Sequence, residues 1–281
     1  MTAYLLQEMP LMLSLVTDMT DFVFIDSGIG GIPYMLQLLQ QAPSALCAYV
    51  ADTANFPYGV KTHDEVVSCV IPLVKKIKEK YSPSVVVFAC NTISVNALET
   101  ARKTFPDIQF VGTVPAIKLA SGVSKKRRIG LLATKATCEN PYNLELKKSF
   151  ASDCELILRA DGDLVSYIEH NAFTATREEC LAAIKPSIDF FRQNNCDVII
   201  LGCTHFLNFT DLFKQACAPD ITIVDSVDGV VRHAISVSQK NFNISTEKKY
   251  PELVITGTPE KSELLQYQVI CERYNIKFST F

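Results

Sequence analysis

The sequence reads VVVFACNT at residues 85–92 and VIILGCTH at residues 198–205. Each stretch is an apolar run followed by a small residue, a cysteine and side chains that form hydrogen bonds. Continuous apolar runs of this length are typical of parallel strands that are buried on both faces. The two stretches lie about one domain length apart, since domains commonly hold about 100–200 residues. They predict two similar α/β halves, each presenting one cysteine, Cys90 or Cys203, at a strand end.

The same alternation of apolar and amphipathic stretches continues along the chain. Strands are predicted at 22–26, 46–50, 84–88, 108–112, 128–132, 154–158, 197–201, 221–224 and 252–255. Helices are predicted at 31–41, 62–80, 92–104, 174–194, 205–216 and 226–240. This order predicts an α/β fold with mainly parallel sheets. The predicted division is a first domain over 1–115 plus 220–281, which carries Cys90, and a second domain over 116–219, which carries Cys203.

Composition excludes several classes of function. The chain has 281 residues, of which 48% are hydrophobic and 20% charged, with a formal net charge of −3 and no basic stripe, so we expect no nucleic-acid partner. The apolar patch near the N-terminus lacks the positive flank of a secretory signal, and we interpret residues 1–20 as an extension. No stretch approaches the roughly 20 apolar residues that cross a bilayer, so no membrane partner is expected.

The chain contains ten cysteines, and none of them forms a CxxC pair. This spacing argues against a zinc knuckle or a thioredoxin-type redox motif. In a long chain without a secretory signal, such cysteines are typically reduced thiols, which predicts a cytoplasmic protein. Most of them are expected to act as small hydrophobic residues of the core.

Cys90 and Cys203 differ from the other cysteines in their position. Each is predicted at the carboxyl end of a parallel strand, where α/β proteins bind ligands, and immediately before a helix. The amides and dipole of a helix N-terminus lower the pKa of a thiol, so the sequence predicts two activated sulfurs. Taken singly, each cysteine is more simply a buried apolar residue, and it is the repeated context that favours a chemical role.

Three other strand ends carry polar residues. The stretch DSGIGG at 26–31 combines a carboxylate with glycine amides that suit an anion, although Asp26 and Ser27 are also ordinary helix caps. The stretch ADTANFPYG at 51–59 is a turn that could close over a ligand, and LLATKAT at 131–137 offers hydroxyls that bind a carboxylate or cap a helix.

Of the four histidines, only His205 touches one of these motifs. It follows Cys203 by two residues and could exchange a proton with a thiol or a substrate, although a residue of a first helical turn can also face solvent. The other histidines are too scattered to predict a metal site.

Taken together and in this order, DSGIGG, ADTANFPYG, ACNTIS, LLATKAT and LGCTHF resemble the glutamate racemase family, within the cofactor-independent aspartate/glutamate racemases. The resemblance spans roughly residues 21 to 255. It implies two α/β domains related by pseudo-symmetry, an active site in the cleft between them, and an isomerase that uses no cofactor. It also implies a cytoplasmic enzyme that supplies D-glutamate for peptidoglycan synthesis, and hence for the cell wall and cell shape, and a homodimer.

The resemblance also implies roles for individual residues. Cys90 and Cys203 are the expected catalytic bases, one for each face of the substrate's Cα. Asp26, His205 and Glu169 are expected to assist the thiols. The residues expected to bind substrate are Asp26, Ser27, Tyr58, Gly59, Asn91, Thr92, Thr204 and His205.

The sequence leaves other functions open. Aspartate racemases and hydantoin-type racemases also use two cysteines, and a sequence does not measure the length of a pocket. A two-lobed protein that binds an amino acid without catalysis is a further alternative. The presence of both cysteines disfavours it, because binding alone requires no thiol.

Overall fold

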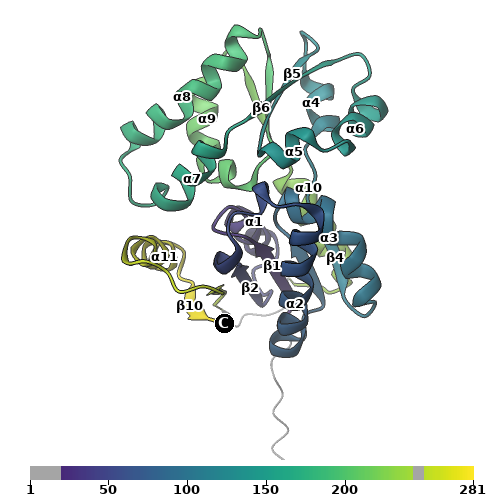
Figure 1. Cartoon of the computed structure of the whole chain (residues 1–281), viewed down its shortest axis with the longest axis vertical. Helices are drawn as coiled ribbons and strands as arrows, with labels where there is room; N and C mark the ends of the chain where they lie inside the picture. Colours follow the sequence, from purple (N-terminus) through teal and green to yellow (C-terminus); the bar gives the residue numbers. More distant parts are fainter. Residues whose placement is uncertain (1–19, 243–249) are drawn as a thin grey trace, which may run out of the picture.

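The computed structural model describes residues 20–242 and 250–281, so that the predicted extension over 1–20 lies, apart from Thr20, outside the described residues. Within these ranges the chain forms two lobes, each built on one parallel sheet that is covered by helices (Figure 1). Every strand pair in both sheets is parallel. The predicted α/β fold with parallel sheets is therefore confirmed.

The larger sheet has six strands. In their order across the sheet they are β10 (Lys277–Thr280), β9 (Glu252–Ile255), β2 (Cys47–Ala51), β1 (Phe22–Asp26), β3 (Val85–Phe88) and β4 (Gln109–Gly112). All five residues of β1 and all four of β3 are buried, which explains why their sequences show continuous apolar runs. Phe22 of β1 pairs with Cys47 on one side and with Val85 on the other, so the carboxyl ends of these strands are aligned.

The smaller sheet has four strands. In order they are β6 (Glu155–Ala160), β5 (Arg128–Ala133), β7 (Val198–Leu201) and β8 (Thr222–Val224). This order repeats β2-β1-β3-β4 of the larger sheet, with β5 in the place of β1 and β7 in the place of β3. The chain reverses its direction of travel across each sheet beside β1 and β5, and ligands of open α/β sheets bind at such switch points.

Helices cover both faces of each sheet. They are α1 (Ile32–Gln41), α2 (His63–Tyr81), α3 (Asn91–Thr104), α4 (Ile117–Val123), α5 (Lys135–Glu139), α6 (Tyr142–Phe150), α7 (Gly162–Asn171), α8 (Arg177–Gln193), α9 (Thr210–Cys217), α10 (Val227–Ser238) and α11 (Lys261–Tyr274). The described part of the chain also contains three short 3-10 helices, namely η1 (Thr53–Asn55), η2 (Tyr58–Val60) and η3 (Thr204–Phe209).

One hydrophobic core runs through both lobes. It joins the face of the larger sheet that carries Phe22 and Phe24 to the face of the smaller sheet that carries Ile199 and Leu201, by way of α1, η3 and α10. The opposite faces of the two sheets have separate cores, beneath α2 and α3 in the larger lobe and beneath α4 in the smaller one. The shared core fixes the two lobes against each other at the carboxyl ends of their strands.

The structure departs from the sequence predictions in three places. The predicted strands are all present to within two residues, but β10 and the helices α4, α5, α6, α7 and α11 had not been predicted. The predicted helix at 205–216 begins as the 3-10 helix η3. Strand β8 pairs with β7 in the smaller sheet, although it lies beyond the predicted end of the second domain at residue 219. The division into two domains stays a prediction, with β8 assigned to the second.

Candidate active site

Cys90 and Cys203 reach the same cavity from different lobes. Cys90 follows β3 and directly precedes α3, and Cys203 follows β7 and directly precedes η3. Both residues lie on the wall of a cavity of about 120 Å³, and they are 8% and 6% exposed. This volume is well below the roughly 300–1,000 Å³ of pockets that hold drug-sized ligands, so the cavity suits a small molecule.

The cavity is formed almost entirely by strand ends and the loops that follow them. Its lining residues are Asp26, Ser27, Phe56, Pro57, Gly59, Val60, Cys90, Asn91, Thr92, Thr134, Lys135, Thr137, Gly162, Val165, Gly202, Cys203, Thr204 and His205. Seven of the residues expected to bind substrate are among them, the exception being Tyr58. The structure thus brings motifs from five separate stretches of the chain to one place.

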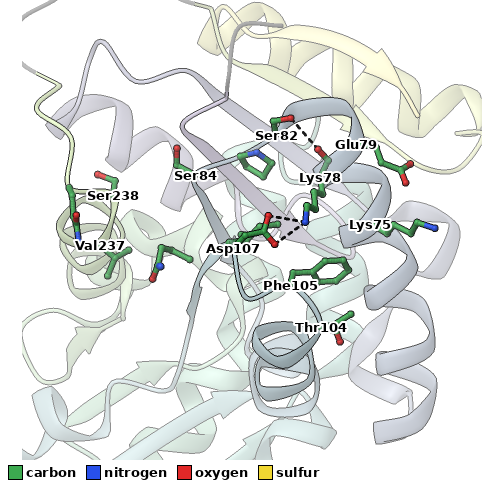
Figure 2. Close-up of a pocket in the computed structure, with 14 residues that line it drawn as sticks. Lys75, Lys78, Glu79, Ser82, Ser84, Thr104, Phe105, Asp107, Val237 and Ser238 are labelled. Carbon is green, nitrogen blue, oxygen red and sulfur yellow. Dashed lines mark hydrogen bonds and ion pairs between the residues drawn. The ribbon is translucent and has the colours of Figure 1, made fainter.

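A larger cavity, of about 920 Å³, lies elsewhere (Figure 2). Its lining residues include those at the amino ends of β3 and β4 and at the carboxyl ends of α2 and α10. Its most prominent charges, Lys78 and Asp107, neutralise each other through an ion pair of 2.8 Å. Neither Cys90 nor Cys203 lines this cavity, so its size alone does not make it the better candidate.

Burial controls the acidity of the Cys90 thiol. Loss of water raises its pKa well above the ordinary value of 9.0, the charges of Asp26 and Cys203 raise it further, and the backbone N–H groups of Ile93 and Thr92 act in the opposite direction. The prediction that a helix N-terminus lowers the pKa of this thiol is therefore wrong for Cys90. The reason is that the first turn of α3 is buried together with the sulfur, and desolvation outweighs the amide dipoles.

Cys203 is linked to a buried acid–base pair. Its Sγ lies 3.8 Å from Nδ1 of His205, and Nε2 of the same ring lies 2.8 Å from Oε2 of Glu169. Burial by itself lowers the pKa of His205, but its hydrogen bonds with Cys203 and Glu169 outweigh that effect and raise the pKa well above 6.5. These contacts therefore favour the imidazolium form of the ring, with one N–H directed at the sulfur and the other at the carboxylate.

The glycine-rich loop after β1 packs against this pair. The backbone N–H of Ile29 donates to Oε2 of Glu169 at 2.9 Å. A Cβ at Gly28 would lie 2.2 Å from the same oxygen, and a Cβ at Gly30 would lie 2.6 Å from Nδ1 of His205. Gly28 and Gly30 of DSGIGG are thus required for close approach of the backbone to Glu169 and His205. The sequence had suggested instead an anion-binding turn.

Asp26 connects the two lobes beside the sulfurs. One carboxylate oxygen accepts from the Thr204 hydroxyl at 2.8 Å, and the other accepts from the backbone N–H of Ser27 at 2.6 Å. Complete burial raises the pKa of Asp26 to about 6, although the charge of His205 and these hydrogen bonds oppose the rise. Asp26 can therefore change its protonation state close to neutral pH.

Asn91 carries an unused acceptor at the cavity. Its Nδ2 donates to the backbone carbonyl of Gly202 in the other lobe. Among the buried side-chain nitrogen and oxygen atoms of the described residues, its Oδ1 is the one that lacks a hydrogen-bond partner. Because an unpaired buried acceptor is costly, this atom is suited to receive a donor from a bound molecule.

Tyr58 and Gly59 have different surroundings. The Tyr58 side chain is fully buried, its hydroxyl donates to Asp52, and it does not line the cavity. Gly59 does line it, where a Cβ would lie 2.9 Å from the Thr134 side chain. Thr134 accepts from the backbone N–H of Thr137 and so caps α5 while also facing the cavity, which combines the two roles that the sequence left open.

Sequence reasoning missed several lining residues. Gly162 and Val165 lie on α7, which follows β6 and was not predicted, and no motif marks them. Phe56 was seen only as part of a turn, yet its ring centroid lies 5.8 Å from that of His205. Its position after β2 was the available signal, since β2 ends at the same sheet edge as β1.

The described residues show neither a metal centre nor a membrane-spanning helix. No group of three or more histidine, cysteine, aspartate or glutamate side chains among the described residues has the arrangement of a metal site. In the same part of the chain, no helix combines the length and the apolar character needed to span a bilayer.

Comparison with known proteins agrees with this geometry. Residues 32–234 match the Asp/Glu/Hydantoin racemase family. The glutamate racemase of Treponema pallidum (strain Nichols) is 38% identical over 260 residues, which cover 92% of this chain and 96% of the relative. The glutamate racemase of Shewanella oneidensis is 36% identical over 225 residues, which cover 80% of this chain and 81% of the relative. The crystal structure of Escherichia coli glutamate racemase, in complex with L-glutamate and the activator UDP-MurNAc-Ala, superposes with a TM-score of 0.81 at 26% identity over 92% of this chain and 97% of that one. The chain therefore belongs to the Asp/Glu/hydantoin racemase family.

Proposed function

We propose that the protein is a glutamate racemase that interconverts L- and D-glutamate by proton transfer at Cα. The observation that carries the proposal is that Cys90 and Cys203, from different lobes, line one small cavity. Racemisation removes a proton from one face of a carbon and delivers a proton to the other face, so it needs an acid–base group on each side. The relatives that match over most of this chain bear the name glutamate racemase, which favours glutamate over aspartate or a hydantoin.

The polar groups around the sulfurs suit an amino acid. The unpaired Oδ1 of Asn91 is placed to accept from the substrate ammonium. Ser27, Thr92 and Thr134 line the same cavity, and a hydroxyl group can donate to a carboxylate oxygen. Donors to the α-carboxylate are the chemically important ones, because negative charge grows there when Cα loses its proton.

The reaction starts with one sulfur as thiolate and the other as thiol. The thiolate takes the Cα proton, which breaks the C–H bond and forms an S–H bond, and the electron pair passes into the α-carboxylate. The thiol on the opposite face then gives its proton to Cα and becomes a thiolate. Proton and charge are conserved within the pair of sulfurs, and the direction of the reaction decides which cysteine begins as the base.

The surroundings of the two sulfurs favour different protonation states. The raised pKa of Cys90 keeps it a thiol at neutral pH. The imidazolium of His205, directed at Cys203, can stabilise a thiolate there, and Glu169 holds the positive charge in place. We propose that Cys90 starts as the thiol and that His205 stabilises the Cys203 sulfur when it acts as the base. Because thiols perform both transfers, the scheme requires no cofactor.

Circular dichroism on L-glutamate, without any added cofactor, tests the proposal. The wild-type protein should convert L-glutamate into an equal mixture of enantiomers, so that its circular dichroism decays to zero. In deuterium oxide the product should carry deuterium at Cα. The Cys90→Ala and Cys203→Ala variants should each lose at least about a thousandfold in activity while keeping their melting temperature, because no other group replaces the lost base. Near-full activity of either variant would refute the two-base scheme.

The same assay separates the alternatives. Racemisation of L-aspartate in place of L-glutamate would identify an aspartate racemase. Binding of glutamate with no change in optical rotation would identify a protein that binds an amino acid without catalysis. The competing substrates differ by one methylene, which a pocket commonly distinguishes by about 10–200-fold in kcat/KM.

We further propose a cytoplasmic enzyme whose D-glutamate serves peptidoglycan synthesis and which forms a homodimer. The dimer is supported by an apolar surface on α4 and α6, where Leu119, Val123, Leu144 and Phe150 are 53%, 41%, 65% and 45% exposed. The two helices pack against each other, and the Ser121 hydroxyl donates to the Phe150 carbonyl. Exposed apolar patches of this kind mark interaction sites. Sedimentation of the Leu144→Glu variant, expected to be monomeric, tests this assignment.

A further inference from the structure

The pair formed by His205 and Glu169 beside Cys203 is contacted by a segment that lies outside the residues matched by the family model. Helix α11 packs against α7, on the side of the molecule away from α2 (Figure 1). Residues 250–281, which include α11, follow the matched range 32–234. The contact between α11 and α7 centres on Glu169, which is 6% exposed and bound to His205.

Gln266 fixes the backbone at Glu169. Its Nε2 donates to the backbone carbonyl of Glu169, and its Oε1 accepts from the backbone N–H of Phe173 at 3.1 Å. Gln266 is 1% exposed, so both ends of its amide are committed to the end of α7. A buried glutamine with both of its polar atoms satisfied by one partner segment fixes that segment's position, since either bond is costly to lose.

Tyr267 orients the carboxylate of Glu169. Its hydroxyl lies 3.4 Å from Oε1, while Oε2 is held by His205 and by the backbone N–H of Ile29. The Tyr267 ring is itself held by Phe278 of β10, with stacked rings whose centroids are 6.0 Å apart. The carboxylate thus has a donor on each oxygen, which determines the direction in which Oε2 faces His205.

We propose that Gln266 and Tyr267 are positioning residues that hold Glu169, and through it His205, in register with the Cys203 sulfur. The proposal rests on the proposed function, because it assigns these residues to one of the two proton transfers. Neither residue lines the cavity, so neither is expected to touch the substrate. In the described part of the chain α11 packs mainly against α7 and β10, and Cys90 lies on neither element, so the effect should be confined to the Cys203 side.

The groups that face His205 determine what a loosened Glu169 would do. They are Cys203 beside β7, Glu169 on α7 and, at longer range, Asp26 at the end of β1. Glu169 is the group whose position depends on α11. If it moves away, the imidazolium loses a hydrogen bond and a countercharge, so the pKa of His205 falls toward its ordinary value and less cation is available beside the Cys203 thiolate.

The test uses two variants and two matched controls in the full-length chain. Gln266→Leu removes both amide bonds, and Tyr267→Phe removes only the hydroxyl and keeps the ring against Phe278. The controls are Gln268→Leu and Tyr274→Phe, the same changes on the same helix at an exposed glutamine and at a tyrosine that is 36% exposed. If Gln266→Leu does not fold, Tyr267→Phe decides the result alone.

The kinetic arm distinguishes positioning from a general structural role. For Gln266→Leu we expect kcat to fall at least about tenfold with little change in KM, since misplacement of a supporting group by about 1 Å can cost a hundredfold. For Tyr267→Phe we expect a smaller loss. With C2-deuterated L- and D-glutamate, the isotope effect should rise for only one enantiomer, the one deprotonated by Cys203. An unchanged kcat, or an equal rise for both enantiomers, would overturn the proposal.

The second arm does not depend on activity. Nitrogen-15 NMR of labelled histidines, with the His205 signals assigned from a His205→Asn spectrum, measures the pKa of His205 in each variant. It should fall in Gln266→Leu and Tyr267→Phe and stay constant in both controls. An unchanged pKa in both test variants would refute the inference even if the wild type is a racemase. If the wild-type protein racemises no substrate, the proposed function is refuted. The measured pKa of His205 then decides whether Gln266 and Tyr267 position Glu169.

Discussion

At the scale of single residues, the site depends on a few buried charges that folding alone would not favour. Asp26 is fully buried at the end of β1, and its pKa is raised from the ordinary 3.8 to about 6. A carboxyl group whose pKa is higher in the folded state binds a proton more readily there, so its contribution to stability is present below pH 4 and is lost as the pH rises through 6. This shift corresponds to about 3 kcal/mol.

Replacement of Asp26 by Asn should therefore stabilise the protein and damage its activity. At pH 7.5 we expect the free energy of unfolding of Asp26→Asn to exceed that of the wild type by up to about 3 kcal/mol, because the neutral amide has no charge to desolvate. At pH 4.5, which is still above the unfolded-state pKa of 3.8, the difference should fall to about 1 kcal/mol. Urea titrations at the two pH values measure this change. A difference that is independent of pH would show that Asp26 does not titrate as described.

Gly28 provides a test of the close approach between the loop after β1 and Glu169. A Cβ at this position would lie 2.2 Å from Oε2 of Glu169, so Gly28→Ala must displace either the loop or the carboxylate that holds His205. We expect kcat/KM to fall by about a hundredfold. In the matched control, Gly229→Ala on α10, the added Cβ meets nothing within 4 Å, and stability should rise by about 0.5–1 kcal/mol with unchanged activity.

At the scale of elements, helix caps hold the loops of the cavity. Thr62 caps α2 and forms a reciprocal capping box with Glu65, directly after the stretch that contributes Gly59 and Val60 to the cavity. Thr176 forms the same box with Glu179 at the start of α8 and does not line the cavity. The two caps are chemically alike and differ in their distance from the site.

The paired variants Thr62→Ala and Thr176→Ala separate stability from function. Each should lower the free energy of unfolding by about 1 kcal/mol, the usual cost of losing a threonine cap. Only Thr62→Ala should raise KM for glutamate, because it frees the segment that closes one wall of the cavity. Equal KM values in the two variants would show that this segment is held by other contacts, such as the bond from Tyr58 to Asp52.

The elements also explain how far sequence reasoning reached. Strands β3 and β7 were predictable because both faces of each are buried, and their cysteines followed from the repeated pattern. Helix α11 has a weakly amphipathic sequence and β10 is half exposed, so neither produced a periodic signal. The acidity of Cys90 could not be predicted either, since a sequence identifies the helix that follows a cysteine but not the burial that opposes it.

At the scale of the whole molecule, the site exists only where the two lobes meet. Contacts such as Thr204 to Asp26 and Asn91 to Gly202 join the lobes across the cavity. A ligand held between the lobes should strengthen this junction, because a ligand that binds only the native state stabilises it, by about 2.7 kcal/mol at one hundred times its Kd.

Calorimetry on the Cys90→Ala variant, which cannot turn over its substrate, measures this effect. Saturating L- or D-glutamate should raise the melting temperature by about 2–4 °C per kcal/mol for a chain of this size. L-aspartate at the same concentration should raise it less. Equal shifts of the melting temperature with aspartate and glutamate would contradict the proposal that glutamate is the preferred substrate.

Both sulfurs belong to residues that are more than nine-tenths buried, and this has a consequence for timing. Each conversion leaves the two sulfurs in the protonation pattern suited to the reverse conversion. The free enzyme is therefore ready to bind the enantiomer that it has just released. To accept the original enantiomer again it must relax through a proton exchange with water that reaches the sulfurs slowly. At high substrate concentration this relaxation should limit net conversion, and isotopic tracer should then pass between the enantiomers faster than the optical signal decays.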